Sequence, residues 1–485
     1  MIKLNQRFSR SPYLEILTEE QVYAIHSTSL GILERTGMQC ANEAALKIFR
    51  QGGAYVAGNS VRIPPIMIEQ ALQTAPSRIL ITGRHGKGEV LLERNVVNYG
   101  LGTDLMYHID PYTGKARLTV LKDVANIAKV VHKCKHIDFT SDSGFPSDIQ
   151  PELQDLYQYR MGVDYCDKPF FIAVDNGENM RALIEMDTVF AGSSGEPNRT
   201  PSLIVYREPV SPLMFHETAV EVLLVCAEYK VPVVFTPILQ TGATGPMTLA
   251  GSIAQGNAET LASLVLHQLR APGAPFIWGP GVSMMDMHTT LFCYGGPIIM
   301  KAQAALGQIG RFYNLPIFGF TGITDSATID VQCGIEMMWS VLINALAGLN
   351  LCHDVGYMNS GLLGSLEAIL LGNEIISAVS SFMDGIQINE ETLALEIINK
   401  VGSDGNFLHE EHTRKFLRQE SWYPQFLNRK QLKSWQSEGG RTVNQALREK
   451  ACQIIEEDAP LLISEVEAKE LDKIITAREK QLDIK

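Results

Sequence analysis

The segments PFFIAV (169–174), SLIVYR (202–207) and PVVFTP (232–237) decide the fold class of this chain. Each is a continuous apolar run of strand length, which is typical of parallel strands covered on both faces. Five further runs of this kind lie at 97–102, 137–142, 275–279, 316–320 and 350–354, and amphipathic segments such as 247–270 separate them. Eight β/α repeats predict a closed TIM (β/α)8 barrel of the α/β class.

A doubly wound sheet is the alternative fold. It is expected to carry a GxGxxG phosphate turn after its first strand, and YGLGTD (99–104) lacks the complete pattern. Residues before the first strand show helix signals from Thr18 onward, and the sequence turns helical again after residue 364. We therefore predict a helical N-terminal extension (1–94), the barrel (95–362), and a helical C-terminal cap and tail (363–485).

The composition limits which kinds of binding partner and which cellular compartment we expect for this chain. A net charge of −13, with the basic residues thinly spread, offers no stripe that could neutralise nucleic-acid phosphates, and it suits a cationic ligand. The eight cysteines are scattered and predict reduced, mostly buried thiols. Because neither a signal peptide nor an apolar run of spanning length is present, we expect a cytoplasmic chain without a membrane partner.

Functional groups of such a barrel collect at the carboxyl ends of the strands. This rule selects Tyr99, Asp104, Asp142, Asp175, Asn176, Tyr206, Glu208, Gln240, Thr241, Trp278, Thr321, Asp325, His353, Asp354 and Tyr357. The set contains neither a GxSxG elbow nor an HExxH motif. Its aromatic rings recur beside acidic residues, a composition that binds quaternary or protonated amines, although core packing explains each ring alone equally well.

The sequence supports metal binding less well than amine binding. His409 and His412 in HEEH (409–412) fall on one helical face, and the other histidines and cysteines show no tight spacing. We expect no metal in the chain itself. Arg311 could clamp a carboxylate, yet it closes the helix before the seventh strand, which favours the opposite end of the barrel.

Four stretches resemble a known family. They are PILQT (237–241), GATGPMTLAGSIAQGNAE (242–259), TGITDSATIDVQCGIE (321–336) and NLCHDVGYMNSGLLGSLEAILLGNEII (350–376). They resemble the trimethylamine methyltransferase superfamily over nearly the whole chain. The resemblance implies a TIM barrel and a corrinoid (cobalamin) protein that docks at its mouth. The founding archaeal members carry pyrrolysine there, and this sequence shows none; the loop 325–330 is our candidate for that position.

Members without pyrrolysine are similar to methyltransferases for glycine betaine, proline betaine, carnitine and related quaternary amines. A quaternary ammonium already has a neutral tertiary amine as its leaving group, which explains the missing catalytic triad. The barrel then has to desolvate the cation, aim one methyl group and neutralise the carboxylate. We predict a substrate site with Asp325 and Gln240 as methyl-positioning residues, and as ligand-binding residues Tyr99, Tyr206, Glu208, Trp278, Tyr357, His353 and Arg311.

Glycine betaine is the favoured methyl donor, with trimethylamine, proline betaine and carnitine as alternatives. A second hypothesis is a metal-dependent lyase or hydrolase that uses Asp142, Asp175, Glu208 and His353. A third is a non-catalytic betaine-binding module. The helical ends of the chain predict a homo-oligomer.

Overall fold

The computed structural model describes residues 13–190 and 201–483. Its centre is formed by eight short strands, each of which lies inside one of the eight predicted runs. They are β6 (Asn98–Tyr99), β9 (Thr140–Ser141), β10 (Phe170–Ala173), β11 (Leu203–Arg207), β13 (Val233–Phe235), β15 (Phe276–Ile277), β17 (Phe318–Phe320) and β18 (Leu351–His353).

The eight strands form a closed ring. The parallel order β15-β13-β11-β10-β9 makes one arc, and the parallel order β17-β18-β6 makes the other. Two parallel bridges join the arcs, one between Gly100 and Phe139 and one between Trp278 and Ile317. The prediction of a TIM barrel is confirmed, and the doubly wound alternative is excluded because no strand of the ring is left as an edge.

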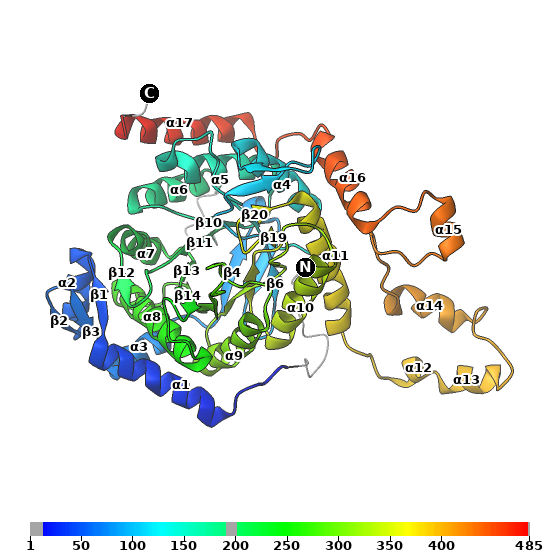
Figure 1. Ribbon diagram of the computed structural model, residues 1–485, viewed down its shortest axis with the longest axis horizontal. Helices are drawn as coiled ribbons and strands as arrows, with labels where there is room; N and C mark the ends of the chain where they lie inside the picture. The colour runs from blue at the N-terminus through cyan, green and yellow to red at the C-terminus, as the bar shows by residue number, and fades with distance from the viewer. Residues whose placement is uncertain (1–12, 191–200, 484–485) are drawn as a thin grey trace.

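One helix follows each strand, and the eight helices surround the ring (Figure 1). They are α4 (Leu121–Lys133), α5 (Gln154–Tyr165), α6 (Gly177–Val189), α7 (Glu217–Tyr229), α8 (Leu249–Arg270), α9 (Pro297–Tyr313), α10 (Val331–Ala347) and α11 (Leu366–Met383). Helix α11 packs against both α10 and α4. It is therefore the eighth barrel helix, and the predicted barrel end at residue 362 stops short of it.

Helix α11 is the one described helix that is long and apolar enough to cross a membrane. Its apolar residues instead face its neighbours, and 72% of the helix is buried in the fold. This burial is typical of a core helix, and it explains why an 18-residue apolar segment lies in the wall of the barrel.

Aromatic and branched side chains fill the interior of the barrel. The interior cluster contains Phe139, Phe171 and Phe318 together with Ile79 and Leu92. The last two belong to a hairpin of β4 (Ile79–Thr82) and β5 (Glu89–Leu92), which directly precedes the first barrel strand. The hairpin therefore closes the amino-terminal end of the barrel, and the carboxyl end is left for function.

The N-terminal extension combines helices with a small sheet. Helices α1 (Glu19–Gly31) and α3 (Pro65–Thr74) pack on α8, and α2 (Glu43–Gly52) lies beside them. The strands β1 (Met38–Cys40), β2 (Tyr55–Ala57) and β3 (Ser60–Arg62) form a sheet that β12 (Met214–Phe215) of the barrel extends. The extension contains the predicted helices, and it also contains strands that the sequence did not reveal, because three-residue strands are too short to show a period of two.

Short strands also line the open end of the barrel. A mouth sheet is formed by β7 (Tyr107–Ile109), β8 (Ala116–Leu118), β19 (Tyr357–Met358) and β20 (Leu363–Gly364). Beside it, β14 (Ile238–Thr241) pairs with β16 (Gly281–Met284). These strands lengthen the loops that follow β6, β13, β15 and β18, and so they deepen the mouth.

The C-terminal region leaves the barrel and returns to it. Helices α12 (Glu390–Leu393), α13 (Leu395–Val401) and α14 (Glu411–Glu420) lie in a segment that projects away from the barrel (Figure 1). After α15 (Leu432–Ser437), helix α16 (Val443–Glu456) packs on α11 and α4, and α17 (Glu465–Gln481) packs on α6 and α5. The region is helical as predicted, but only its last two helices cover the barrel wall.

Candidate functional site

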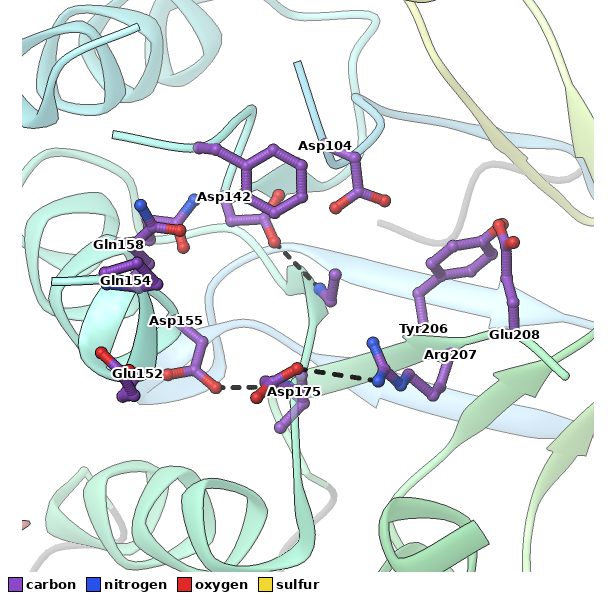
Figure 2. A pocket seen from close by; sticks show the side chains of 14 residues that line it. Asp104, Asp142, Glu152, Gln154, Asp155, Gln158, Asp175, Tyr206, Arg207 and Glu208 are labelled. Atoms are coloured by element: carbon purple, nitrogen blue, oxygen red, sulfur yellow. Dashed lines mark hydrogen bonds and ion pairs between the residues drawn. The ribbon is translucent and has the colours of Figure 1, made fainter. Parts of the chain in front are cut away.

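A cavity of about 450 Å³ opens at the carboxyl end of the barrel. Figure 2 shows that its side chains come from the ends of β9, β10 and β11, from the loop after β6, and from the start of α5 with the turn before it. Six of the lining residues are acids and one is a cation: Asp104, Asp142, Glu152, Asp155, Asp175 and Glu208, with Arg207. The cavity therefore carries a surplus of carboxyl groups.

Loss of hydration raises the pKa of the innermost carboxyl groups. Burial is the main cause for Asp142, whose pKa is also raised by the nearby Asp104 and stands well above its usual range. Burial likewise raises the pKa of Glu208 to about 7, although the Tyr206 hydroxyl donates a hydrogen bond to it. The pKa of Asp104 is raised by burial and by Asp354. The four acids therefore form one electrostatic group.

The pair His353 and Asp354 ends β18 beside this cavity. The Nδ1 atom of His353 lies 2.8 Å from the Oδ1 atom of Asp354, and both residues are buried. Asp354 has a left-handed backbone with φ of +79°. A Cβ atom at Gly102 would lie 1.9 Å from the Asp354 Oδ1 atom, so only glycine permits this approach. The backbone of Asp354 is thus locally strained, and this conformation places its carboxyl group at the mouth.

Several buried polar atoms of the mouth have no hydrogen-bond partner within residues 13–190 and 201–483. They are the Asp142 Oδ1, Arg207 Nε, Thr321 Oγ1, His353 Nε2 and Tyr357 hydroxyl atoms and both carboxyl oxygens of Asp354, one of which lies close to the His353 Nδ1 atom. Buried polar atoms in folded proteins are nearly always bonded, and exceptions gather at functional sites. The arrangement is that of a site built for a polar or charged ligand.

Aromatic rings surround His353. Its ring centroid lies 4.3 Å from that of Phe318, 4.8 Å from that of Phe320 and 5.9 Å from that of Tyr206. Tyr294 packs edge-on against Phe320, and its pKa is raised by burial and then by Asp354 and Glu208. The acids of the mouth therefore stand above and beside a layer of rings.

Four of the predicted site residues come together in this arrangement. Tyr206, Glu208, His353 and Tyr357 all belong to the acidic and aromatic mouth. Tyr357 begins β19, four residues after the end of β18, and burial and then Asp354 raise the pKa of its hydroxyl well above the usual range. The residues that the sequence rule placed at neighbouring strand ends are thus neighbours in space.

Two predicted ring residues face the other way. Trp278 is fully buried between the barrel and its helices, where its Nε1 atom donates to the Asn257 Oδ1 atom at 3.2 Å and its ring meets Tyr313 edge-on. Tyr99 also packs in the layer between strands and helices. Neither ring reaches the mouth, so neither belongs to a cage there.

Arg311 lies at the opposite end of the barrel. It donates to the main-chain oxygen of Ala347 at 2.5 Å, and its guanidinium stacks over the ring of Tyr13. Arg311 therefore lies outside the mouth. Arg207 at the end of β11 is the cation that the cavity presents instead.

The two predicted methyl-positioning residues have structural partners. The carboxylate of Asp325 accepts hydrogen bonds from the backbone N–H groups of Tyr294 and Gly295, at 2.9 and 2.8 Å. It thereby fixes the loop that carries the Tyr294 ring. The main-chain oxygen of Gln240 accepts the N–H groups of Ala243 and Thr244 and so holds the turn after β14.

Sequence reasoning missed Arg207 and Tyr294. Arg207 is the last residue of the predicted strand SLIVYR (202–207), and the strand-end rule selects its neighbours Tyr206 and Glu208 instead. Tyr294 lies in FCYGGP (292–297), in the long loop after the sixth strand. The signal that could have found it is a ring beside a Gly-Gly turn in a loop that opens on the mouth. Among the residues that the structure describes, no group of three or more His, Cys, Asp or Glu side chains could hold a metal ion.

Comparison with known proteins assigns the chain. The family described as trimethylamine methyltransferase (MTTB) matches residues 3–483, nearly the full length. The chain belongs to the trimethylamine methyltransferase family. It is 31% identical over 472 residues to trimethylamine methyltransferase MttB of Desulfitobacterium hafniense strain DCB-2, with 96% of this chain and 94% of that protein covered.

Two further similarities agree with this assignment. The glycine betaine methyltransferase of Desulfitobacterium hafniense strain Y51 is 29% identical over 97% of this chain and 98% of that protein. The crystal structure of the hydroxylamine MtmB complex aligns with a TM-score of 0.50 at 10% identity and covers 90% of this chain and 92% of that one. The structural likeness supports the barrel fold, and the family shows that the chain is a methyltransferase of methylated amines.

Proposed function

We propose that this chain moves a methyl group from a quaternary ammonium, glycine betaine in particular, to the Co(I) centre of a corrinoid carried by a partner protein. The observation that carries the proposal is the mouth itself, where six acids and one arginine line a cavity beside a layer of rings. The family supplies the methyl-transfer chemistry, and the charge and shape of the mouth supply the class of donor.

A cationic ligand suits the mouth because it compensates the buried carboxyl groups. Ionised carboxylates without a counter-charge are costly in a dehydrated site, and their pKa values rise until they hold protons instead. A fixed cation between Asp104, Asp142 and Glu208 makes the ionised forms favourable again. The rings of Tyr206 and Tyr357 add cation-π attraction, worth about 0.5–2 kcal/mol per ring.

The carboxylate of a betaine requires a positive group on one side of the same cavity. Arg207 meets this need: its Nη2 atom forms an ion pair with the Asp175 Oδ1 atom at 3.7 Å and donates to the Thr218 Oγ1 atom, whereas its Nε atom lacks a hydrogen-bond partner in the described part of the chain. His353 is the second candidate, through its Nε2 atom. A zwitterion would thus be held with its ammonium group toward the acids and its carboxylate toward Arg207.

The proposed reaction needs little covalent chemistry from the side chains of this protein. A Co(I) corrinoid supplies the nucleophile. With such a corrinoid at the mouth, the methyl carbon would bond to cobalt as the C–N bond breaks, and the electron pair of that bond would stay on nitrogen to give a neutral tertiary amine. The side chains strip water from the cation, hold its orientation and keep one methyl group exposed at the mouth.

The rim of the mouth offers a surface for the partner that carries the corrinoid. Exposed large apolar side chains occur on the loops after β6, β9, β13 and β15; they are Met106, Tyr107, Phe145, Met247, Met287 and Leu291. Met247 and Met287 are neighbours, because both side chains approach Gly242. We call these six residues the apolar collar. Methionine-rich apolar surfaces adapt to partner proteins.

A donor panel tests the proposed chemistry with free cob(I)alamin as acceptor. Glycine betaine, proline betaine, carnitine, trimethylamine and tetramethylammonium are compared by the loss of cob(I)alamin absorbance and by the demethylated amine. We expect glycine betaine to be the best donor, with dimethylglycine formed in equal amount. Trimethylamine as the best donor would contradict the choice of substrate, and inactivity with every donor would contradict the proposal.

The collar is tested separately with a corrinoid protein that serves as acceptor. The double variant Met247→Glu/Met287→Glu should raise the KM for that protein at least tenfold and leave the rate with free cob(I)alamin unchanged. The control is Ile66→Glu, an equally exposed apolar residue on α3. An unchanged KM would remove the collar from the docking surface.

We place the reaction in the cytoplasm, since Co(I) and eight free thiols both need reducing surroundings.

A further inference from the structure

A long C-terminal arm leaves the barrel without packing on it. The arm comprises residues 384–420 with helices α12, α13 and α14, and it projects away from the barrel wall (Figure 1). No residue of α12 or α13 is buried, and Phe416 is the single buried residue of α14. The chain returns at Trp422, whose Nε1 atom donates to the Ser377 Oγ atom of α11 at 3.0 Å. The arm is therefore anchored at both ends and open between them.

The arm exposes many large apolar side chains. Eight of them each expose 43% or more of their surface: Ile386, Ile388, Leu393, Leu395, Ile398, Phe407, Leu408 and Leu417. Helices of four to ten residues are not stable in water by themselves and depend on packing. A solvated spacer would carry polar residues at these positions. The composition indicates a segment that is covered in the assembled protein.

The outer face of α10 provides a second uncovered apolar surface. Val331, Ile335, Met338 and Trp339 expose 78%, 60%, 38% and 37% of their surface. Their spacing places them on one stripe of the helix, at positions where a barrel helix normally presents charged residues to water. Helix α10 packs against α11, from whose end the arm starts. The stripe and the root of the arm thus share one side of the barrel.

We infer that the arm of one chain covers the α10 stripe of a second copy of the same chain. Both surfaces lie on every copy, so a two-fold axis pairs them twice, arm on stripe and stripe on arm, as in an isologous dimer. Together the twelve side chains offer on the order of 1,000 Å² of apolar area per copy, which exceeds the roughly 800 Å² that each partner buries in a stable interface. The inference is independent of the substrate and of the corrinoid partner.

Sedimentation velocity on the full chain tests the dimer. The arm variant Leu395→Glu/Ile398→Glu and the stripe variant Ile335→Glu/Trp339→Glu should each weaken dimerisation at least a hundredfold and give monomers at micromolar concentration. The control Tyr55→Glu/Ile66→Glu changes two equally exposed apolar residues of the N-terminal extension and should stay dimeric. Circular dichroism verifies that each variant is folded. A monomeric wild-type chain, or dimers in both variants, would overturn the inference.

A cross-link identifies which surfaces meet. A photoreactive benzoylphenylalanine in place of Leu395, in a mixture of unlabelled and 15N-labelled chains, should attach to peptides of α10 and give mixed-isotope products. Products formed only within one chain, or on another surface of the second copy, would contradict the pairing of arm and stripe.

Discussion

Binding of a permanent cation should strengthen as the pH rises through about 7, because Glu208 then ionises. The pKa of this carboxyl is about 7 in the ligand-free protein, against an ordinary 4.5. At 1.36 kcal/mol per pH unit, ionising Glu208 in the dehydrated mouth costs about 3 kcal/mol more than in water. A unit cation about 5 Å away, at an effective dielectric constant of about 20, contributes about 3 kcal/mol of attraction. The ligand therefore offsets the cost, and the pKa of bound-state Glu208 returns toward its ordinary value.

The expected size of the effect follows from this linkage. Between pH 5.5 and 8.5 the affinity for tetramethylammonium should rise about ten- to thirtyfold in the wild-type chain. The substitution Glu208→Gln should remove the component centred near pH 7 and lower the affinity at pH 8.5 to or below the value that the wild-type chain shows at pH 5.5. Isothermal titration calorimetry measures both, and tetramethylammonium is chosen because its charge does not change with pH.

The folding stability of the ligand-free protein should change with pH in the direction opposite to that of the ligand affinity. A carboxyl with a raised pKa binds a proton in the native state when the unfolded chain has already lost it. The ligand-free protein should therefore lose stability as the pH rises from about 4.5 to 7, and tetramethylammonium should restore it. Glu217→Gln, at an exposed helix start after the same strand, is the matched control. Flat affinity from pH 5.5 to 8.5, or full pH dependence in Glu208→Gln, would refute the reasoning.

Two further predictions separate the mouth from the wall of the barrel. Tyr357→Leu should weaken tetramethylammonium binding about five- to thirtyfold, because a cation-π contact of about 1–2 kcal/mol is lost. Trp278→Leu should leave binding unchanged and lower the free energy of unfolding in urea by about 3 kcal/mol. Equal effects of the two variants on affinity would argue against placing Tyr357 in the mouth and Trp278 in the wall. Gly102→Ala should reduce methyl transfer to free cob(I)alamin at least tenfold, because the new methyl group displaces Asp354, and Gly31→Ala, whose Cβ meets no atom within 4 Å, should be silent.

The positions of the barrel strands were predictable because each is a short, continuous apolar run between helical segments. The direction of their side chains was not, for the same reason. When both faces of a strand are apolar, the sequence does not show which residues point inward. Tyr206 and Tyr99 look alike in the sequence, yet Tyr206 belongs to the interior cluster and Tyr99 to the layer under the helices.

The composition of the mouth was predictable in part from the strand-end rule. Glu208 follows β11, His353 ends β18 and Tyr357 lies four residues beyond it, so the topology alone brings them to one end of the barrel. Tyr294 comes from a long loop, and its place depends on the hydrogen bonds that Asp325 makes to residues 294 and 295. Contacts between distant loops leave no local pattern in a sequence, so the strand-end rule selects Asp325 but does not reveal the loop that it fixes.

The surplus of acids in the mouth also bears on the kind of amine that the site selects. A protonated tertiary amine can pass its proton to a carboxylate of the mouth that is still ionised, because burial raises the pKa of carboxyl groups such as Asp142 and favours their neutral form; both groups then become neutral. Such a transfer removes the charge attraction and leaves an uncharged amine in a polar cavity. A quaternary ammonium has no proton to give, so its charge persists and the acids must ionise to meet it. The same carboxyl groups that destabilise the ligand-free barrel thus favour a permanent cation, the form of donor whose C–N bond breaks without an added acid.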